Sequence, residues 1–156
     1  MATSWKHKLT KETNPRIVEI PPSWEKKMGV GTMFIATPKM INDLILCIPR
    51  GMLVTQESIR EFLALKNHTQ ITCPLTTGIF CWIAAWANEE MSHESGHVQV
   101  PWWRVIKSDG YLNPKFPGRQ LLQKERLERE GFTIVPGRKK DSWMVRATAN
   151  KFYHFE

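Results

Sequence analysis

Apolar residues recur at helical spacing in the middle of the chain and predict three successive helices. Within residues 39–48, isoleucine and leucine return every three or four positions. Residues 56–66 repeat this pattern directly after Thr55, a residue type favoured as an N-cap. A third helix is predicted from residue 74 to about residue 88. The short intervals between the three segments are typical of a helix-turn-helix.

The second half of the chain predicts strands, turns and one more helix. Residues 98–106 are rich in β-prone types, and Ser108-Asp109-Gly110 is a strong turn signal, so we expect a strand, turn and wing over 98–118. Residues 118–130 carry spaced leucines, and Gly131 is a suitable C′ residue for that helix. Short strands are expected at 132–135 and 143–146.

These elements predict an α/β (α+β) fold, a winged helix-turn-helix of the DNA-binding type with short wing strands and a C-terminal helix. Residues 39–135 would form this domain. Residues 1–38 are expected to be an irregular basic arm, packed in part on the domain because two tryptophans are unusual in a disordered tail. Residues 136–156 are expected to be a basic C-terminal tail or strand.

Composition points to a soluble protein with a polyanionic partner. Of 156 residues, 42% are hydrophobic, and the formal net charge is +7, which favours a partner such as nucleic acid. No apolar run reaches the ~18 residues needed to span a membrane. Three cysteines without Cys-x-x-Cys spacing indicate buried thiols in a reducing compartment. We expect a cytoplasmic monomer without membrane contact.

Residues 101–110, with the sequence Pro-Trp-Trp-Arg-Val-Ile-Lys-Ser-Asp-Gly, form the most informative segment. They resemble the active-site strand of the 6-O-methylguanine-DNA methyltransferase family, in which Pro-Cys-His-Arg-Val precedes a Ser/Gly turn. Further matches follow in the same order at the right spacing. They are Ile48-Pro49-Arg50-Gly51 with Val54-Thr55, Asn88 after the third helix, Phe116-Pro117-Gly118, and Glu130-Gly131. The resemblance therefore covers about residues 39–135.

The resemblance breaks at the two residues that carry the family's chemistry. Trp102 stands where the family has its acceptor cysteine, and Trp103 stands where it has the activating histidine, whereas Glu130 is retained. Alkyl transfer needs a thiolate, and an indole offers one N–H donor and no nucleophilic lone pair. Alkyl transfer to position 102 is therefore excluded, and we expect no catalytic residue, metal or cofactor. The related alkyltransferase-like proteins also have this tryptophan, but usually keep the histidine after it.

The resemblance implies two groups of binding residues. A lesion pocket is expected from Trp102, Trp103, Arg104, Val105, Phe116, Pro117, Gly118 and Glu130. Contacts with duplex DNA are expected from Gln56, Thr77, Gly78, Ile79, Cys81, Asn88, Lys107, Ser108 and Lys115. Gln56 replaces the family's tyrosine, and Ile79 replaces its arginine finger, although an apolar side chain can still wedge between bases. Glu130, without its histidine, is expected to be a solvated or paired carboxylate at a helix end.

The third helix leaves two functions open. Trp82 and Trp86 form an apolar stripe that packs under the N-terminal arm, near Trp5 or Trp24, or faces a partner. The first hypothesis is a catalytically inactive protein of DNA repair that binds duplex DNA and recognises alkylated guanine. The alternative is a protein-interaction module that reuses the fold. Exposed tryptophans with few basic neighbours would favour the alternative.

Two further motifs point to chemistry that we do not expect to operate. His93-Glu94-Ser95-Gly96-His97 matches the zinc-enzyme pattern His-Glu-x-x-His, which works only on a helix. Because the segment contains Gly96, we expect an exposed polar loop, and whether its histidines bind metal stays open. Cys73 and Cys81 could in principle be relocated alkyl acceptors, but apolar neighbours favour structural thiols.

Overall fold

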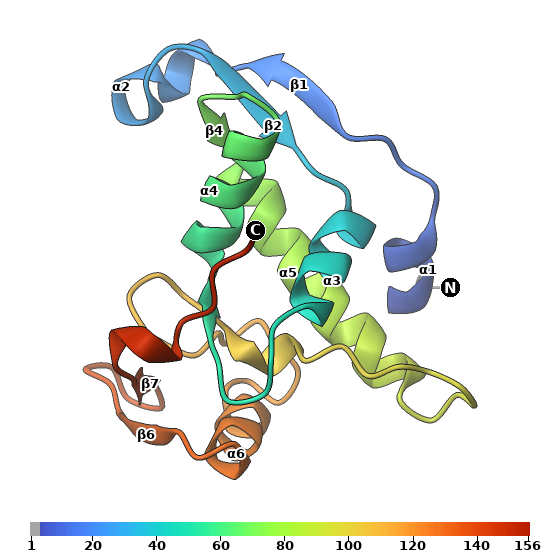
Figure 1. Ribbon diagram of the computed structural model, residues 1–156, viewed down its shortest axis with the longest axis vertical. Coiled ribbons are helices and arrows are strands. Elements are labelled where there is room, and N and C mark those ends of the chain that lie inside the picture. Colours follow the sequence, from blue (N-terminus) through green and yellow to red (C-terminus); the bar gives the residue numbers. More distant parts are fainter. Residues whose placement is uncertain (1–3) are drawn as a thin grey trace.

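A computed structural model describes residues 4–156, and helix α5 (Pro74–Met91) runs through its middle. Helices α3 (Pro38–Leu46) and α4 (Gln56–Lys66) pack against α5 (Figure 1). The three expected helices are confirmed. The α4 bounds agree with the sequence pattern, α3 lies within two residues of it, and α5 extends three residues further. The mixed α/β character is also confirmed.

Threonine side chains cap the N-termini of α3 and α4. The Thr37 hydroxyl accepts a hydrogen bond from Met40 N (3.2 Å), and the Thr55 hydroxyl accepts one from Ser58 N (3.1 Å). Each cap satisfies one of the N–H groups that the first turn of a helix leaves free. The faces turned to the core carry Ile41, Ile45, Ile59 and Leu63.

From residue 4 on, the N-terminal arm is folded, which corrects the expectation of an irregular segment. It contains α1 (Trp5–Thr10), β1 (Arg16–Glu19), the 3₁₀ turn η1 (Pro22–Trp24), α2 (Glu25–Met28) and β2 (Thr32–Ile35). Strand β2 pairs antiparallel with β1 and parallel with β4 (Ile71–Thr72), which lies between α4 and α5. Strands of two to four residues are too short to show a period, so only tertiary pairing reveals them.

Helix α1 packs against the second half of α5, as expected of part of the arm. Leu9 is 5% exposed and lies in a cluster with Ile83, Ala87 and Met91. The arm is thus joined to α5 through α1 and to β4 through β2. The expected domain boundaries at residues 38 and 135 stay a prediction.

The expected strand over residues 98–106 is largely wrong. Residues 98–101 have no regular structure, Trp102–Arg104 form the 3₁₀ turn η2, and only Val105–Ile106 form a strand, β5. Local turns account for the difference, because Trp102 N bonds to Val100 O (2.8 Å) and Arg104 N to Pro101 O (3.1 Å). Strand β5 pairs in parallel with β3 (Val54–Thr55), which places η2 beside the start of α4.

Helix α6 (Leu121–Arg129) begins three residues later than expected. The φ angles of Gly118, Arg119 and Gln120 are 77°, 49° and 84°, a left-handed backbone that cannot continue into a helix. Gly131 follows the helix with a φ of 91°, which confirms it as the C′ residue. Strands β6 (Thr133–Pro136) and β7 (Trp143–Arg146) form an antiparallel hairpin, so the two expected strands are confirmed within one residue.

The wing turn and the C-terminal hairpin form one antiparallel unit. Leu112 N donates to Trp143 O (2.9 Å), and Val145 N donates to Gly110 O (3.0 Å). The end of the chain returns to the core after the 3₁₀ turn η3 (Ala149–Lys151), where Phe155 lies 5.3 Å from Phe62 between ring centroids. The tail is therefore more than a basic strand, since its aromatic residues pack on α4.

Two of the apolar clusters lie beneath the helices and the C-terminal hairpin. The larger core lies between α3, α4, α5 and η2, and the smaller lies beneath the hairpin around Leu53, Ile106, Leu112, Leu127 and Phe132. Within residues 4–156, no helix combines the length and the apolar character needed to cross a membrane.

Candidate nucleic-acid interface

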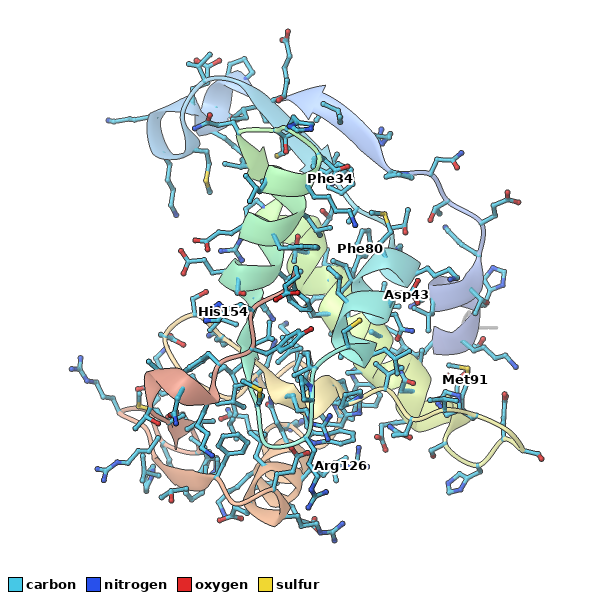
Figure 2. All side chains as sticks on the ribbon, viewed as in Figure 1. Phe34, Asp43, Phe80, Met91, Arg126 and His154 are labelled. Carbon is cyan, nitrogen blue, oxygen red and sulfur yellow. The ribbon has the colours of Figure 1, made fainter. Side chains whose placement is uncertain are left out.

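Trp102, at the position of the family's acceptor cysteine, is completely buried. Its Nε1 donates to Glu89 Oε1 on α5 (3.0 Å), and its ring meets Phe116 edge to face with 5.5 Å between centroids. Arg126, which Figure 2 labels on α6, donates from Nη2 to Glu89 Oε2 (3.1 Å), and its guanidinium lies 5.2 Å from the centre of the Trp102 ring. An indole held by a carboxylate, an arginine and an aromatic ring is a packed structural unit.

Trp103 takes the histidine position and keeps a hydrogen bond to Glu130. Its Nε1 lies 2.6 Å from Glu130 Oε2, and Arg104 Nε lies 3.0 Å from both carboxylate oxygens. Gly51 N adds a third donor at 2.7 Å. The Glu130 side chain is only 3% exposed, so of the two expected alternatives it is the paired carboxylate. Its hydrogen bonds to three parts of the chain give this carboxylate a structural role.

Gln123 is a further organising residue that no sequence pattern revealed. It is completely buried, and its Nε2 donates to Trp103 O (3.1 Å) and Val105 O (2.8 Å). Its Oε1 accepts from Asn113 N (3.1 Å). The side chain thus links η2 and β5 to the loop before α6. A polar residue in a charged helix gives no signal of such contacts.

The lesion pocket expected from the resemblance is filled in this structure. Four of its residues are buried: Trp102, Val105, Phe116 and Pro117. Trp103, Arg104 and Glu130 belong to the hydrogen-bonded network, and Gly118 is exposed at the turn into α6. The residues expected to form the pocket are therefore packed against one another, and lesion binding at this place stays a prediction. The indole of Trp102 fills the space beside Phe116.

Four of the expected DNA contacts meet in one hollow of about 250 Å³. Its lining consists of Gln56, Pro74, Leu75, Gly78, Ile79, Trp82, Asn113 and Lys115, and we call it the α5 hollow. A Cβ added to Gly78 would meet nothing closer than Gln56 Oε1 at 3.8 Å, so the helix surface is open there. None of the lining residues is acidic. A small helical residue beside a lysine suits close approach to a phosphate backbone.

Three other expected DNA contacts are buried, which corrects that part of the prediction. Thr77 is 1% exposed, and Cys81 and Asn88 are completely buried. Asn88 holds the segment before η2, because its Oδ1 accepts from Val100 N (3.3 Å) and its Nδ2 donates to Asn42 Oδ1 (3.0 Å). Helix α5 is apolar on almost all of its faces. The spacing of its apolar residues therefore does not show which face is exposed and which faces are buried.

The Cys81 thiol is held in its neutral form. Burial raises its pKa to about 12, although the nearby Arg60 guanidinium acts in the opposite direction. Cys73 is buried as well, whereas Cys47 is exposed, so the expectation of buried thiols is wrong for Cys47. Because only a thiolate attacks an alkyl carbon efficiently, Cys81 is a structural thiol, as expected, and does not replace the missing acceptor.

The two tryptophans of α5 are half-buried and covered by neighbours. Trp86 stacks on Trp5 of α1 with 5.7 Å between centroids and an interplanar angle of 20°, and its Nε1 donates to Lys115 O (2.8 Å). Lys115 Nζ lies 5.4 Å from the centre of the Trp82 ring. The arm covers Trp86 with Trp5 and not with Trp24. A cation over Trp82 favours an anionic partner at this face more than an apolar one.

The remaining expected contacts, Lys107 and Ser108, are exposed on the wing turn. Lys107 borders a separate hollow of about 350 Å³ between the wing and the β6–β7 turn. We call this the wing hollow, and the basic residues Arg138, Lys139 and Lys140 also line it. The sequence predicted a basic tail over residues 136–156, but its position beside the wing depends on tertiary structure.

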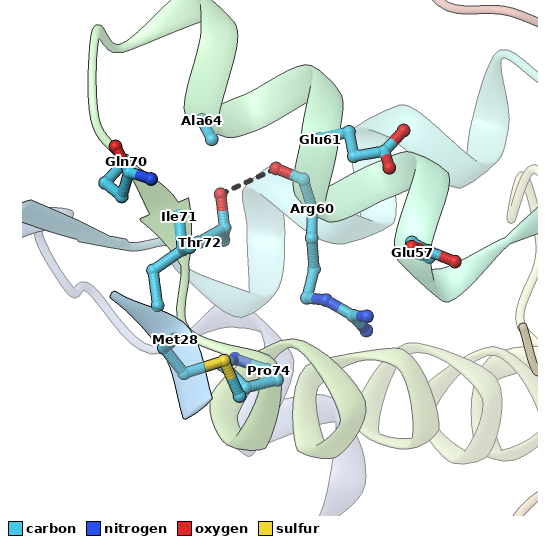
Figure 3. A pocket seen from close by; sticks show the side chains of 9 residues that line it. All are labelled: Met28, Glu57, Arg60, Glu61, Ala64, Gln70, Ile71, Thr72 and Pro74. Atoms are coloured by element: carbon cyan, nitrogen blue, oxygen red, sulfur yellow. Dashed lines mark hydrogen bonds between the residues drawn. The ribbon is translucent and has the colours of Figure 1, made fainter. Parts of the chain in front are cut away.

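Another hollow lies between α2, α4, β4 and the start of α5, outside the expected sites. Arg60 extends from α4 toward α5 there, with Glu57 nearby on α4 (Figure 3). The Thr72 hydroxyl donates to Arg60 O (2.8 Å) and ties β4 to the helix. Its mixture of one arginine and two glutamates gives this hollow little net charge, so it suits a polyanion less than the α5 hollow does.

The motif His93 to His97 lies in turns after the end of α5. His97 Nε2 is 3.1 Å from Asn88 Oδ1, and His93 is exposed. The helical spacing that would place both histidines on one face is therefore missing. Among residues 4–156, no three His, Cys, Asp or Glu side chains are grouped in a way that could hold a metal ion.

Comparison with known proteins finds similarity at the level of solved structures. No protein-family model matches the sequence, and no curated protein matches it. A crystal structure of S. pombe ATL, an alkyltransferase-like protein, in complex with DNA is 22% identical, with a TM-score of 0.49. A structure of S. pombe Atl1 in complex with damaged DNA containing O6-carboxymethylguanine is 21% identical, with a TM-score of 0.48. Each comparison covers 74% of this chain and 93% of the other.

Proposed function

We propose that this protein is a catalytically inactive, alkyltransferase-like DNA-binding protein. It binds duplex DNA through the α5 hollow, acts in DNA repair and recognises alkylated guanine without alkyl transfer. The observation that carries the proposal is the pairing of an open helix surface at Gly78 with Lys115, in a hollow lined by no carboxylate. The net charge of +7 supports the same class of partner.

The network around η2 supports the absence of alkyl transfer. Trp102 and Trp103 each give their single N–H to a carboxylate, and Cys81 keeps its proton. Neither indole is a nucleophile, so no covalent intermediate can form with an alkyl group at these positions. Intact-mass measurement after incubation with a 6-O-methylguanine duplex is expected to show an unchanged protein mass. A mass increase of one methyl group would contradict this part of the proposal.

Recognition of alkylated guanine requires the filled pocket to open. Trp102 and Phe116 would have to move before a flipped base could stack against the indole. Opening the pocket costs free energy, and this cost lowers the apparent affinity for a damaged base. We therefore expect a preference for the lesion that is small beside the general affinity for duplex DNA.

A pair of substitutions at Gly78 tests the interface directly. Gly78→Glu places a carboxylate in the α5 hollow and is expected to abolish duplex binding in fluorescence anisotropy, because it repels phosphates. Gly78→Ala is the matched control, since it fits the same space without charge. It should keep most of the binding and raise helix stability by up to about 1 kcal/mol.

The result of this pair separates the interface from folding. Thermal unfolding of both variants should show a folded protein, because Gly78 has helical backbone geometry and open space beside it. If a folded Gly78→Glu variant binds duplex DNA as well as the unaltered protein does, the α5 hollow is not the interface.

One observation favours the alternative of a protein partner. An apolar hollow of about 480 Å³ lies beside the start of α5, lined by Trp24, Met28, Pro74 and Leu75 with Ser23 and Lys27. Leu75 is 62% exposed, and grooves of this composition accept apolar side chains of other proteins. Leu75→Asp would weaken a protein complex at this site. Because Leu75 also lines the α5 hollow, this substitution would place a carboxylate at the proposed DNA interface as well. Met28→Asp changes only the apolar hollow of these two, so it should weaken a protein complex and leave duplex binding unchanged.

A further inference from the structure

The wing hollow gathers cations from two parts of the chain that are distant in sequence. Lys107 comes from the wing turn, and Arg138, Lys139 and Lys140 come from the turn between β6 and β7. All four are exposed, and two carboxylates, Asp109 and Asp141, lie among them. Asp109 Oδ1 already accepts a hydrogen bond from Tyr111 N (3.1 Å). The hollow therefore carries an excess of positive charge.

These four cations form no ion pair with any of the carboxylates that the structure describes. Several other cations of the described chain are paired, such as Lys6 with Glu94 and Arg129 with Glu125. Unpaired cations that converge on one hollow retain their charge for an external anion. Phosphodiester oxygens are the acceptors that such a set of lysines and arginine recognises.

The basic turn is held in a fixed shape. Gly137 N donates to Ser142 O (2.9 Å), and the Tyr111 hydroxyl accepts from Arg138 N (3.2 Å). A Cβ at Gly137 would collide with the Tyr111 ring, so only glycine permits this approach. Gln120 adds a further tie, because its Oε1 accepts from Trp143 N (2.9 Å). A preformed turn loses little conformational entropy when it binds.

The wing hollow adjoins the α5 hollow. Asn113 and Lys115 line the α5 hollow, and Pro114, which lies between them in the chain, lines the wing hollow. The two hollows therefore share the loop of residues 113–115. A duplex bound at the α5 hollow extends beyond that hollow on both sides. Its phosphates can therefore also bind a second set of cations in the adjoining wing hollow.

We propose that the β6–β7 turn and Lys107 form a second phosphate-binding site, which holds the sugar–phosphate backbone of duplex DNA beside the α5 hollow. This site rests on the proposed function, and it assigns a role to the basic C-terminal segment outside the family resemblance. It contributes affinity and no base preference, because phosphates are the same in every sequence.

A matched pair of double variants tests the site. Lys139→Ala with Lys140→Ala removes two charges from the wing hollow, and Lys26→Ala with Lys27→Ala removes two exposed charges from α2, at the opposite end of the long axis (Figure 1). Affinity for an undamaged duplex is measured by fluorescence anisotropy over a series of salt concentrations. Removing one phosphate contact makes the slope of log K against log salt shallower by about 0.9.

The expected result is a shallower slope for the wing variant, by about 0.9 or more, and an unchanged slope for the α2 variant. Equal slopes for the two variants would contradict the second site, because the loss of any two positive charges would then have the same effect on DNA binding. If the unaltered protein binds no duplex at all, the proposed function fails, and the second site fails with it. Circular dichroism of both variants, whose replaced side chains are all exposed, verifies that each is folded.

Discussion

At the scale of single residues, two adjacent tryptophans each donate a hydrogen bond to a carboxylate. Glu89 accepts from Trp102, and Glu130 accepts from Trp103 and from Arg104. A buried N–H without a partner would cost about 1–3 kcal/mol, so each indole at this position needs its acceptor. Both indoles are therefore held in place by the packing of the domain.

Glu130→Gln tests the importance of the buried pair. The substitution leaves the Arg104 guanidinium, whose side chain is 13% exposed, without a counter-charge and is expected to cost about 3 kcal/mol. The matched control is Glu125→Gln, whose carboxylate is 55% exposed and pairs with Arg129; about 0.5 kcal/mol is expected. Urea unfolding measures both values. Similar losses in the two variants would contradict a structural role for Glu130.

The three cysteines are expected to differ in reactivity. Cys47 is exposed, whereas Cys73 and Cys81 are buried. A chromogenic disulfide reagent should therefore react with one thiol in the native protein and with all three in denaturant. Burial raises the pKa of Cys81 from 9.0 to about 12, so its neutral form stabilises the fold below pH 9.0, and this contribution is lost as the pH rises toward 12. Rapid native labelling of Cys81 would contradict its burial.

At the scale of elements, sequence patterns identified long helices and missed short strands. The helices α3 and α4 were predictable because isoleucine and leucine recur on one face and a threonine stands at each N-cap. The pairing of β2 with β4 was not predictable, because two residues of β4 carry no period. Helix α1 was missed for the same reason, since its six residues contain only one buried side chain.

Leu9→Ala tests whether α1 is part of the folded unit. Leu9 is 5% exposed against α5, and its truncation is expected to cost about 2 kcal/mol or more in the free energy of unfolding. Leu65→Ala is the matched control, because Leu65 is 79% exposed on α4, and its effect should stay within about 0.5 kcal/mol. If Leu9→Ala is as mild as the control in urea unfolding, α1 does not pack as described.

At the scale of the whole molecule, the structure gathers part of the expected DNA-contact set at one hollow, and a role of that hollow in DNA binding stays a prediction. Gln56, Gly78, Ile79 and Lys115 were expected to contact DNA, and the structure brings all four to one hollow. The residues expected to line the pocket are instead packed together. The sequence shows that bulky indoles stand there, but it does not show that Trp102 packs on Phe116. Glu89 and Arg126 were missed because they meet only through the tertiary contact of α5 with α6.

The measurement that tests the central claim most directly is equilibrium binding of the unaltered protein to two matched duplexes, one with guanine and one with 6-O-methylguanine at a single position. Fluorescence anisotropy at two salt concentrations follows both titrations. Our account predicts that both duplexes bind, that affinity falls with salt, and that the damaged duplex is modestly preferred. No binding to either duplex would contradict the account and direct attention to a protein partner.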